Sequence, residues 1–206
     1  MDIDSPDLIG LATSIESYYY AREHMKGKPR FAGRQDLLVH SMNNITLDGL
    51  VLEFGVGAGH TINLIAGKLS DHVIYGFDSF KGLPERWSHA GPGSFAQDSL
   101  PSVRENVELV VGMFDRTLPT FLDSHDGNVS FLHVDCDLYT STQTVLQQLT
   151  RRVVAGTIIV FDEYFNYDEW KQHEFLAFQQ FIKYNKIRYE YIGLVPRYEH
   201  VAVRVL

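Results

Sequence analysis

The stretch that decides the fold is Leu50-Val51-Leu52-Glu53-Phe54-Gly55-Val56-Gly57-Ala58-Gly59, followed by residues 60–69 (HTINLIAGKL). The short apolar run at its start indicates a buried strand, and the apolar residues after the glycines return at helical spacing. Glycines allow the chain to turn tightly and to approach a ligand without clashes from Cβ atoms. The stretch predicts a strand, a tight turn and a helix, although the glycines alone fit a plain turn as well as a ligand site.

Strands and helices alternate on the C-terminal side of this turn. The predicted strands share nearly unbroken apolar character and cover residues 50–54, 72–77, 107–112, 129–135 and 156–162. The predicted helices have apolar residues at helical spacing and cover residues 6–25, 34–44, 60–69, 116–124, 140–153 and 168–184. Such apolar strands are typical of a parallel sheet with helices on both faces. Two last strand-like runs, 189–195 and 200–206, flank a turn and predict an antiparallel pair. We therefore expect one α/β domain over residues 1–206, a doubly wound, mostly parallel seven-stranded sheet with a C-terminal antiparallel hairpin.

Two segments outside this alternation are candidates for covering a site. Residues 79–106 form a long connection rich in Gly, Pro and Ser, and connections of this length are usually functional lids or disordered. We predict a lid that carries a short helix, with His89 placed to reach a substrate. The helices within residues 1–45 are expected to cover the active site. The tyrosines at 18–20 fit this role, pairing in a homo-oligomer, or simple packing on the core.

Composition narrows the classes of function. The 206-residue chain has 26 acidic and 18 basic residues and a formal net charge of −8, so it lacks the basic surplus with which nucleic-acid binders neutralise phosphates. Cys136 is the single cysteine, which fits a reducing compartment. The first residues do not resemble a signal peptide, and no apolar run approaches the roughly 20 residues of a membrane span. We expect a cytoplasmic protein that acts on a small molecule, without nucleic-acid or membrane partners.

An acidic residue follows the second predicted strand. Asp78 lies 23 residues after Gly55, and in a doubly wound sheet this position brings a carboxylate to the hydroxyls of a nucleoside ribose. A role as a helix cap or turn residue is the alternative. The dinucleotide fingerprint needs a third glycine at position 60, where this chain has His60. A nucleoside cofactor other than a nicotinamide dinucleotide is therefore favoured.

Several sequence blocks resemble those of one enzyme family. The pattern Glu53-x-Gly55-x-Gly57-x-Gly59 resembles the first motif of class I S-adenosylmethionine (SAM)-dependent methyltransferases. The blocks GFDSFKGLPE (76–85), GMFD (112–115), VDCDLYTST (134–142) and IVFDEY (159–164) are similar to successive motifs of the macrocin O-methyltransferase (TylF/MycF-like) family. The resemblance covers roughly residues 45–206. It implies the Rossmann-like class I methyltransferase fold and methyl transfer from SAM to a sugar hydroxyl of a natural product, assisted by a divalent metal, usually Mg²⁺.

The same resemblance implies a set of cofactor-binding residues. They lie at the ends of the first four predicted strands and are Glu53, Gly55, Gly57, Gly59, Asp78, Ser79, Phe80, Gly112, Phe114 and Asp135.

Acidic residues also end the later strands. Asp135 ends one predicted strand, and Asp162 and Glu163 end the next. Because ligands of open α/β sheets bind at the carboxyl ends of the strands, these acids are expected to converge beside the cofactor. Three hard oxygen ligands suit Mg²⁺, and the resemblance implies that these three acids are the metal ligands. The alternative is that Asp135 is a metal-free base or a helix cap, and Asp137 could replace it as ligand or contact the substrate.

Two residues are candidates for catalysis. Asp135 is the first candidate for the general base, and His200, at the start of the last strand, is the second. His133 lies within a predicted strand and is expected to be a satisfied core histidine.

The sequence leaves three alternatives to a sugar O-methyltransferase. A catechol-like or phenolic hydroxyl would suit a carboxylate-bound metal nearly as well as a sugar hydroxyl. An NAD(P)-dependent oxidoreductase shares the fold and the ribose acid but lacks the third glycine. A non-catalytic nucleoside-binding domain would not need Asp162 and Glu163.

Overall fold

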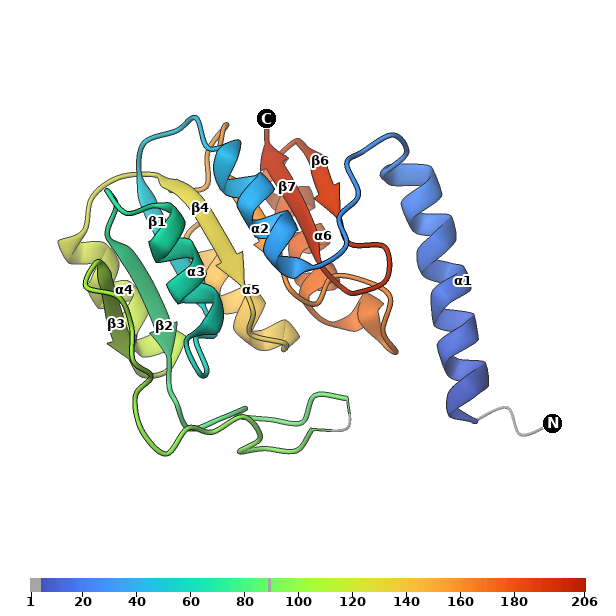
Figure 1. The fold of residues 1–206 in the computed structure, drawn as a ribbon, viewed down its shortest axis with the longest axis horizontal. Coiled ribbons are helices and arrows are strands. Elements are labelled where there is room, and N and C mark those ends of the chain that lie inside the picture. Colours follow the sequence, from blue (N-terminus) through green and yellow to red (C-terminus); the bar gives the residue numbers. More distant parts are fainter. Residues whose placement is uncertain (1–4, 89) are drawn as a thin grey trace.

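A computed structural model describes residues 5–88 and 90–206 of the chain. Its centre is a seven-stranded sheet in the order β3-β2-β1-β4-β5-β7-β6 (Figure 1). The strands are β1 (Leu50–Phe54), β2 (Ile74–Asp78), β3 (Val107–Val111), β4 (Val129–Val134), β5 (Ile158–Phe161), β6 (Tyr189–Leu194) and β7 (Val201–Val205). β1 to β5 pair in parallel, whereas β7 is antiparallel to both β5 and β6. The predicted doubly wound sheet with a C-terminal antiparallel hairpin is confirmed.

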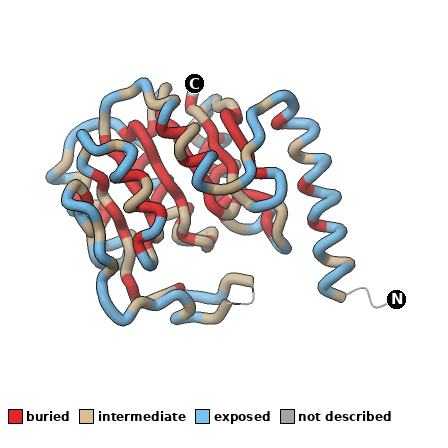
Figure 2. Tube along the Cα trace, in the orientation of Figure 1, coloured by how far each residue is buried: buried red, intermediate tan, exposed pale blue. Residues whose placement is uncertain are grey.

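Helices cover both faces of the sheet. They are α1 (Pro6–His24), α2 (Arg34–Asn43), α3 (His60–Lys68), α4 (Phe114–Ser124), α5 (Tyr139–Gln148), the 3₁₀ helix η1 (Trp170–Gln172) and α6 (Glu174–Asn185). Alternate residues of one strand face opposite layers, as the two-residue period of a strand requires. Val51 packs in the core under α2 and α3, and its neighbours Leu50 and Leu52 pack under α4, α5 and α6. Figure 2 shows the strands as the most deeply buried part of the chain.

Three segments differ from the sequence-based expectation. The helix predicted over residues 140–153 ends at Gln148, because the chain then turns back and the Arg152 carbonyl accepts the N–H of Val129 at the start of β4. The helix predicted over residues 168–184 is divided into η1 and α6, since Glu169 has a φ of +63° and His173 also departs from helical geometry.

The third difference lies in the long connection between β2 and β3. The described residues of 79–106 contain turns and no helix, so the short helix expected there is wrong for this part of the chain. Pro84, Pro92 and Pro101 lack an N–H and interrupt helical bonding. His89 lies outside the described residues.

The N-terminal helix α1 lies beside the β6 edge of the sheet (Figure 1). It is attached through its C-terminal half: Tyr20 shares a hydroxyl–hydroxyl hydrogen bond of 2.6 Å with Tyr191, and the Asn166 N–H donates to the Ser17 hydroxyl at 2.9 Å. Met25, just beyond the helix, is buried in the core. No helix in the described part of the chain has the length and apolar character that crossing a membrane requires.

Candidate active site

A cavity of about 400 Å³ opens at the carboxyl ends of β1 to β5, where the topology of such sheets places ligands. The predicted site residues that line it are Gly55, Gly57, Asp78, Ser79, Gly112, Phe114, Asp135, Asp162 and Glu163. Four other predicted site residues do not line it, namely Glu53, Gly59, Phe80 and His200. Arg34, at the start of α2, adds a cation to the wall, and no residue of α1 in the described part reaches it. The sheet therefore brings most of the predicted residues to one place.

The glycine turn forms one side of the cavity. Gly55 has a φ of +91°, and a Cβ atom there would overlap the carbonyl oxygen of Asp135 on β4's extension. The turn is held by Asp78, whose Oδ2 accepts the N–H groups of Val56 at 2.9 Å and Gly57 at 2.8 Å. Its Oδ1 accepts the N–H of Phe80 at 2.7 Å. Asp78 therefore stabilises the turn, which was the alternative to a ribose contact in the sequence analysis. Its contact with a ribose remains a prediction.

Aromatic side chains form an apolar part of the cavity wall, and one of them follows β3 in the chain. Phe114 opens α4 and meets the buried Phe54 edge-to-face, with ring centroids 5.2 Å apart. Phe95, from the long connection, also lines the cavity and is 60% exposed. Trp87 lines the cavity from the other side, where its ring centroid lies 5.8 Å from that of Tyr167, which follows β5. Aromatic faces of this kind offer a planar ring a stacking surface. Phe114 thus offers its ring to the cavity, and its predicted contact with the cofactor remains a prediction.

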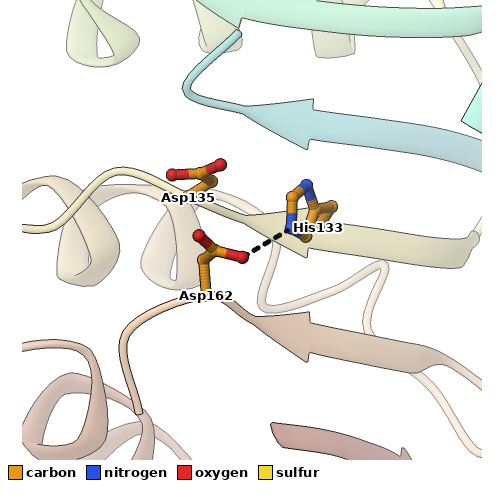
Figure 3. A group of neighbouring side chains, drawn as sticks. All are labelled: His133, Asp135 and Asp162. Carbon is orange, nitrogen blue, oxygen red and sulfur yellow. Dashed lines mark ion pairs between the residues drawn. The ribbon is translucent and has the colours of Figure 1, made fainter. Parts of the chain in front are cut away.

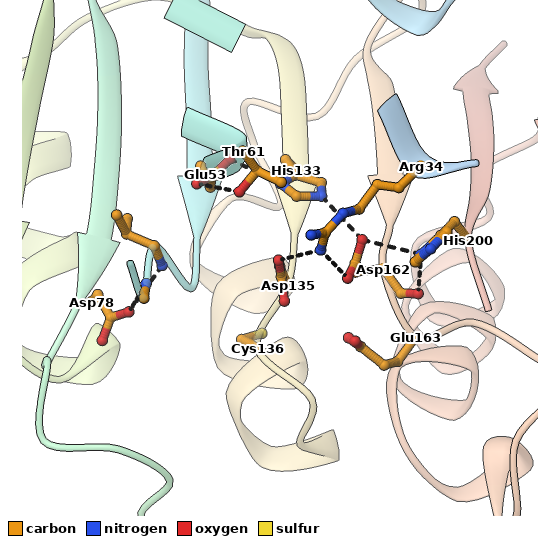
Figure 4. A network of polar contacts seen from close by, with 12 residues as sticks. Arg34, Glu53, Thr61, Asp78, His133, Asp135, Cys136, Asp162, Glu163 and His200 are labelled. Atoms are coloured by element: carbon orange, nitrogen blue, oxygen red, sulfur yellow. Dashed lines mark hydrogen bonds and ion pairs between the residues drawn. The ribbon is translucent and has the colours of Figure 1, made fainter. Parts of the chain in front are cut away.

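A buried charge chain runs behind the glycine turn (Figures 3 and 4). Glu53 is fully buried; its Oε1 accepts the Thr61 hydroxyl at 3.1 Å and its Oε2 lies 2.9 Å from His133 Nδ1. The other ring nitrogen of His133 lies 3.7 Å from Asp162 Oδ1. Burial alone would lower the pKa of His133, but its two acidic partners outweigh burial and raise this pKa to about 10. The expected core histidine is therefore a buried cation between two carboxylates.

Three basic side chains lie close to Asp162. Arg34 Nη1 lies 2.7 Å from its Oδ2, and His200 Nδ1 lies 3.1 Å from its Oδ1. Burial would raise the pKa of Asp162, but contacts with His133 and His200 hold this pKa well below its usual range. His200 also contacts the Asp162 carbonyl at 2.8 Å. These contacts make His200 a support for Asp162 behind the cavity, and its proposed catalytic role remains a prediction.

Three further carboxylates lie together at the cavity: Asp135, Asp137 and Glu163 each offer an oxygen within 4.8 Å of the others. Burial, and then the charge of Asp162, raise the pKa of Asp135 and of Glu163 well above their usual range. The same two causes raise the pKa of Asp137 to about 7. Glu163 Oε2 is buried and has no hydrogen-bond partner among the described residues. Such a group lacks a compensating positive charge, which a bound cation would supply.

Two residues that help to build the site were not predicted from the sequence. Arg34 stands 128 residues from its partner Asp162. Glu174, fully buried at the start of α6, accepts the N–H groups of Cys136 at 3.3 Å and Glu163 at 3.2 Å. Neither residue lies in a motif or follows a strand, so the pattern of the sequence carries no signal for them.

Comparisons with known proteins agree with this geometry. The 4′-O-methyltransferase of Streptomyces olivaceus that acts on 8-demethyl-8-(2,3-dimethoxy-alpha-L-rhamnosyl)-tetracenomycin C is 27% identical over an alignment of 163 residues that covers 64% of this chain. The match spans 60% of that relative's length. Two solved structures share the fold. The calicheamicin methyltransferase CalS11 has a TM-score of 0.64 at 21% identity, over 98% of this chain and 93% of its own. The O-methyltransferase NovP has the same TM-score and identity, over 96% of both chains.

These likenesses support the class I methyltransferase fold, with its Rossmann-like sheet. Residues 52–164, more than half of the chain, match the family described as "Methyltransferase domain". The matched region runs from β1 to the residues just after β5, so it includes the glycine turn and every acidic residue that lines the cavity. The chain therefore belongs to the methyltransferase-domain family.

Proposed function

We propose that the protein is a SAM-dependent O-methyltransferase whose acceptor is a hydroxyl group of a sugar or a related natural product. The observation that carries this proposal is one cavity with two chemically different halves. A glycine turn and an aromatic wall lie on the side of β1 to β3, and carboxylates lie at the ends of β4 and β5. The names of the relatives, one of them a methyltransferase of a rhamnosyl group, support a sugar as the acceptor.

The first half suits SAM. Gly55 and Gly57 leave the turn without side chains, so the amino-acid and ribose parts of the cofactor can lie against the backbone. Asp78 accepts two backbone hydrogen bonds on Oδ2 and one on Oδ1, so a lone pair of Oδ1 remains to accept a ribose hydroxyl. Phe114 would stack on the adenine. This arrangement directs the methyl group towards the carboxylates of β4 and β5.

The second half suits the deprotonation of a hydroxyl. In the proposed reaction the acceptor oxygen attacks the methyl carbon of SAM in line with the C–S bond, which breaks and releases S-adenosylhomocysteine. The hydroxyl proton passes to Asp135, the carboxylate that lines the cavity at the end of β4. Arg34 lies 3.4 Å from Asp135 and fixes its position. Holding oxygen, methyl carbon and sulfur in line supplies much of the rate enhancement.

The carboxylates also fit a divalent cation. Asp135, Asp137 and Glu163 form the best set of oxygen donors, because Glu163 has a buried, unpaired oxygen and Asp137 is free of basic partners in the described part. Asp162, predicted as a ligand, is already paired with Arg34 and His133, so it fits this role less well. Mg²⁺ bound there would lower the pKa of the acceptor hydroxyl.

The test is transfer of a labelled methyl group from SAM to a panel of deoxysugars, glycosides and phenols. With an accepted substrate, Asp135→Asn is expected to lower kcat by roughly 100-fold or more, the usual contribution of a general base. The matched control, Asp123→Asn, changes an exposed aspartate remote from the cavity and should leave kcat unchanged. Chelation with EDTA should lower the rate and Mg²⁺ should restore it. An Asp135→Asn enzyme with the parental kcat would contradict the assignment of the base, and a rate indifferent to EDTA would contradict the metal.

A further inference from the structure

A second cavity of about 700 Å³ lies between α1 and the loops that follow β5 and β6. Four basic residues line it, Arg22, Lys26, Arg30 and Arg197, and we call it the basic groove. No carboxylate lines the groove among the residues that the structure describes. The chain as a whole has a net charge of −8. Four basic residues without acidic neighbours are therefore a local exception to the charge of the protein, and they favour an anionic ligand.

The fold itself does not explain these charges. A basic residue in the last turn of a helix is stabilised by the helix dipole, but of the four only Arg22 has this position. Lys26, Arg30 and Arg197 lie in turns or extended segments. Within residues 5–88 and 90–206, none of the four takes part in an ion pair. Their positive charges are available to a ligand.

α1 lines the groove with Ser14, Ser17, Tyr18, Ala21 and Arg22, whereas Leu11 and Ile15 point outward and are 57% and 48% exposed. A helix that packs on its own domain usually has an apolar stripe towards the core. The hydroxyl groups of Ser14 and Tyr18 are available to a polar ligand in the groove.

The groove and the active site share two short segments of chain. Arg30 lines the groove and Arg34, four residues later, lines the active site; Asn166 lines the groove and Glu163, three residues earlier, lines the active site. Cα atoms three or four residues apart are separated by at most roughly 11–15 Å. The walls of the two cavities therefore come within that distance of each other.

Charge determines which end of a sugar–phosphate ligand goes where. Five carboxylates and Arg34 line the active site, whereas four basic side chains line the groove, so the groove is the more favourable place for a phosphate. On the basis of the proposed function, we propose that the basic groove binds the phosphate groups of the methyl acceptor. The acceptor is then a phosphorylated or nucleotide-activated sugar, methylated before its transfer to another molecule. Guanidinium groups suit this role because they bind phosphate oxygens in pairs.

The direct test is calorimetric titration of the full chain with inorganic pyrophosphate and with UDP at low salt. The groove variant is Lys26→Gln/Arg197→Gln, and the matched control is Arg151→Gln/Lys183→Gln, which removes two exposed charges elsewhere. We expect the groove variant to weaken both Kd values about tenfold or more, through loss of charge-assisted hydrogen bonds. The control should bind like the parent, and all three proteins should bind S-adenosylhomocysteine equally.

A second experiment distinguishes two possible ligands of the groove, a phosphate group of the acceptor and a free phosphate. With an acceptor found in the transfer assay, the groove variant should raise KM about tenfold and leave kcat unchanged, and pyrophosphate should compete with the acceptor. Absence of pyrophosphate and UDP binding to the parent, or equal binding to the groove variant, would overturn the proposal. An unchanged KM would also overturn it, by showing that the groove holds a separate ligand. If the parent protein does not bind S-adenosylhomocysteine, that result would instead contradict the proposed function.

Discussion

Replacing Gly55 with alanine is expected to destabilise the protein by about 3 kcal/mol or more and to abolish S-adenosylhomocysteine binding. The added methyl group would meet the backbone carbonyl of Asp135 where β1 and β4 end side by side. The φ of +91° at this position is also unfavourable for any residue with a side chain. Backbone atoms cannot move aside as a flexible side chain can, so the strands must separate. Urea unfolding followed by circular dichroism measures the loss of stability.

Gly57 provides the matched control for this prediction. It lies in the same turn with a φ of +49°, but a Cβ atom there would have no neighbour within 4 Å. Gly57→Ala should therefore lower the free energy of unfolding by only about 1–2 kcal/mol, the penalty for a side chain in the left-handed backbone conformation. Equal stability of the Gly55→Ala and Gly57→Ala proteins would show that the approach of Gly55 to Asp135 does not restrict this position.

Removing Glu53 is the second change with a large expected effect. Glu53→Leu removes one of the two acidic partners that raise the pKa of the buried His133 to about 10. Breaking a buried ion pair on one side typically costs about 3–5 kcal/mol, because the remaining charge is left without compensation. The Thr61 hydroxyl also loses its acceptor. We expect a loss of this size in urea unfolding at pH 7.

A double-mutant cycle separates the ion pair from the loss of packing. Glu53→Leu/His133→Leu removes both charges, so it should be clearly more stable than the sum of the two single changes predicts. Thr61→Val controls for the hydroxyl alone and should cost about 1 kcal/mol. Additive effects of the two single changes would mean that Glu53 and His133 are not coupled in the folded protein.

The sheet was predictable because each buried strand is an unbroken apolar run in the sequence. β1, β4 and β5 are buried along their whole length, and an unbroken apolar run bounded by turn residues is what this environment selects. The glycine turn was predictable for a similar reason, since its positive φ angles favour glycine. The local sequence is therefore sufficient to predict an element when all of its residues have the same environment, such as full burial.

The electrostatics of the site were less predictable because they depend on contacts between distant segments. Asp162 follows a strand and was predicted as a metal ligand, but its partners Arg34 and His200 come from α2 and from the residue just before β7. Glu53 has the position of a cofactor contact in the motif and yet faces His133 inside the protein. A strand end fixes where a residue lies, whereas its charge partners follow from the packing of the whole fold.

The most direct test of the central claim is calorimetric titration of the protein with S-adenosylhomocysteine, with Asp78→Ala and Asp71→Ala measured beside it. The cavity predicts a Kd of roughly micromolar order for the parent and for Asp71→Ala, an exposed aspartate outside the cavity. Asp78→Ala should bind at least about tenfold more weakly, because the glycine turn loses the carboxylate that accepts its N–H groups. A folded parent protein that does not bind S-adenosylhomocysteine, or that binds a nicotinamide dinucleotide in its place, would contradict the assignment of this cavity as a methyl-donor site.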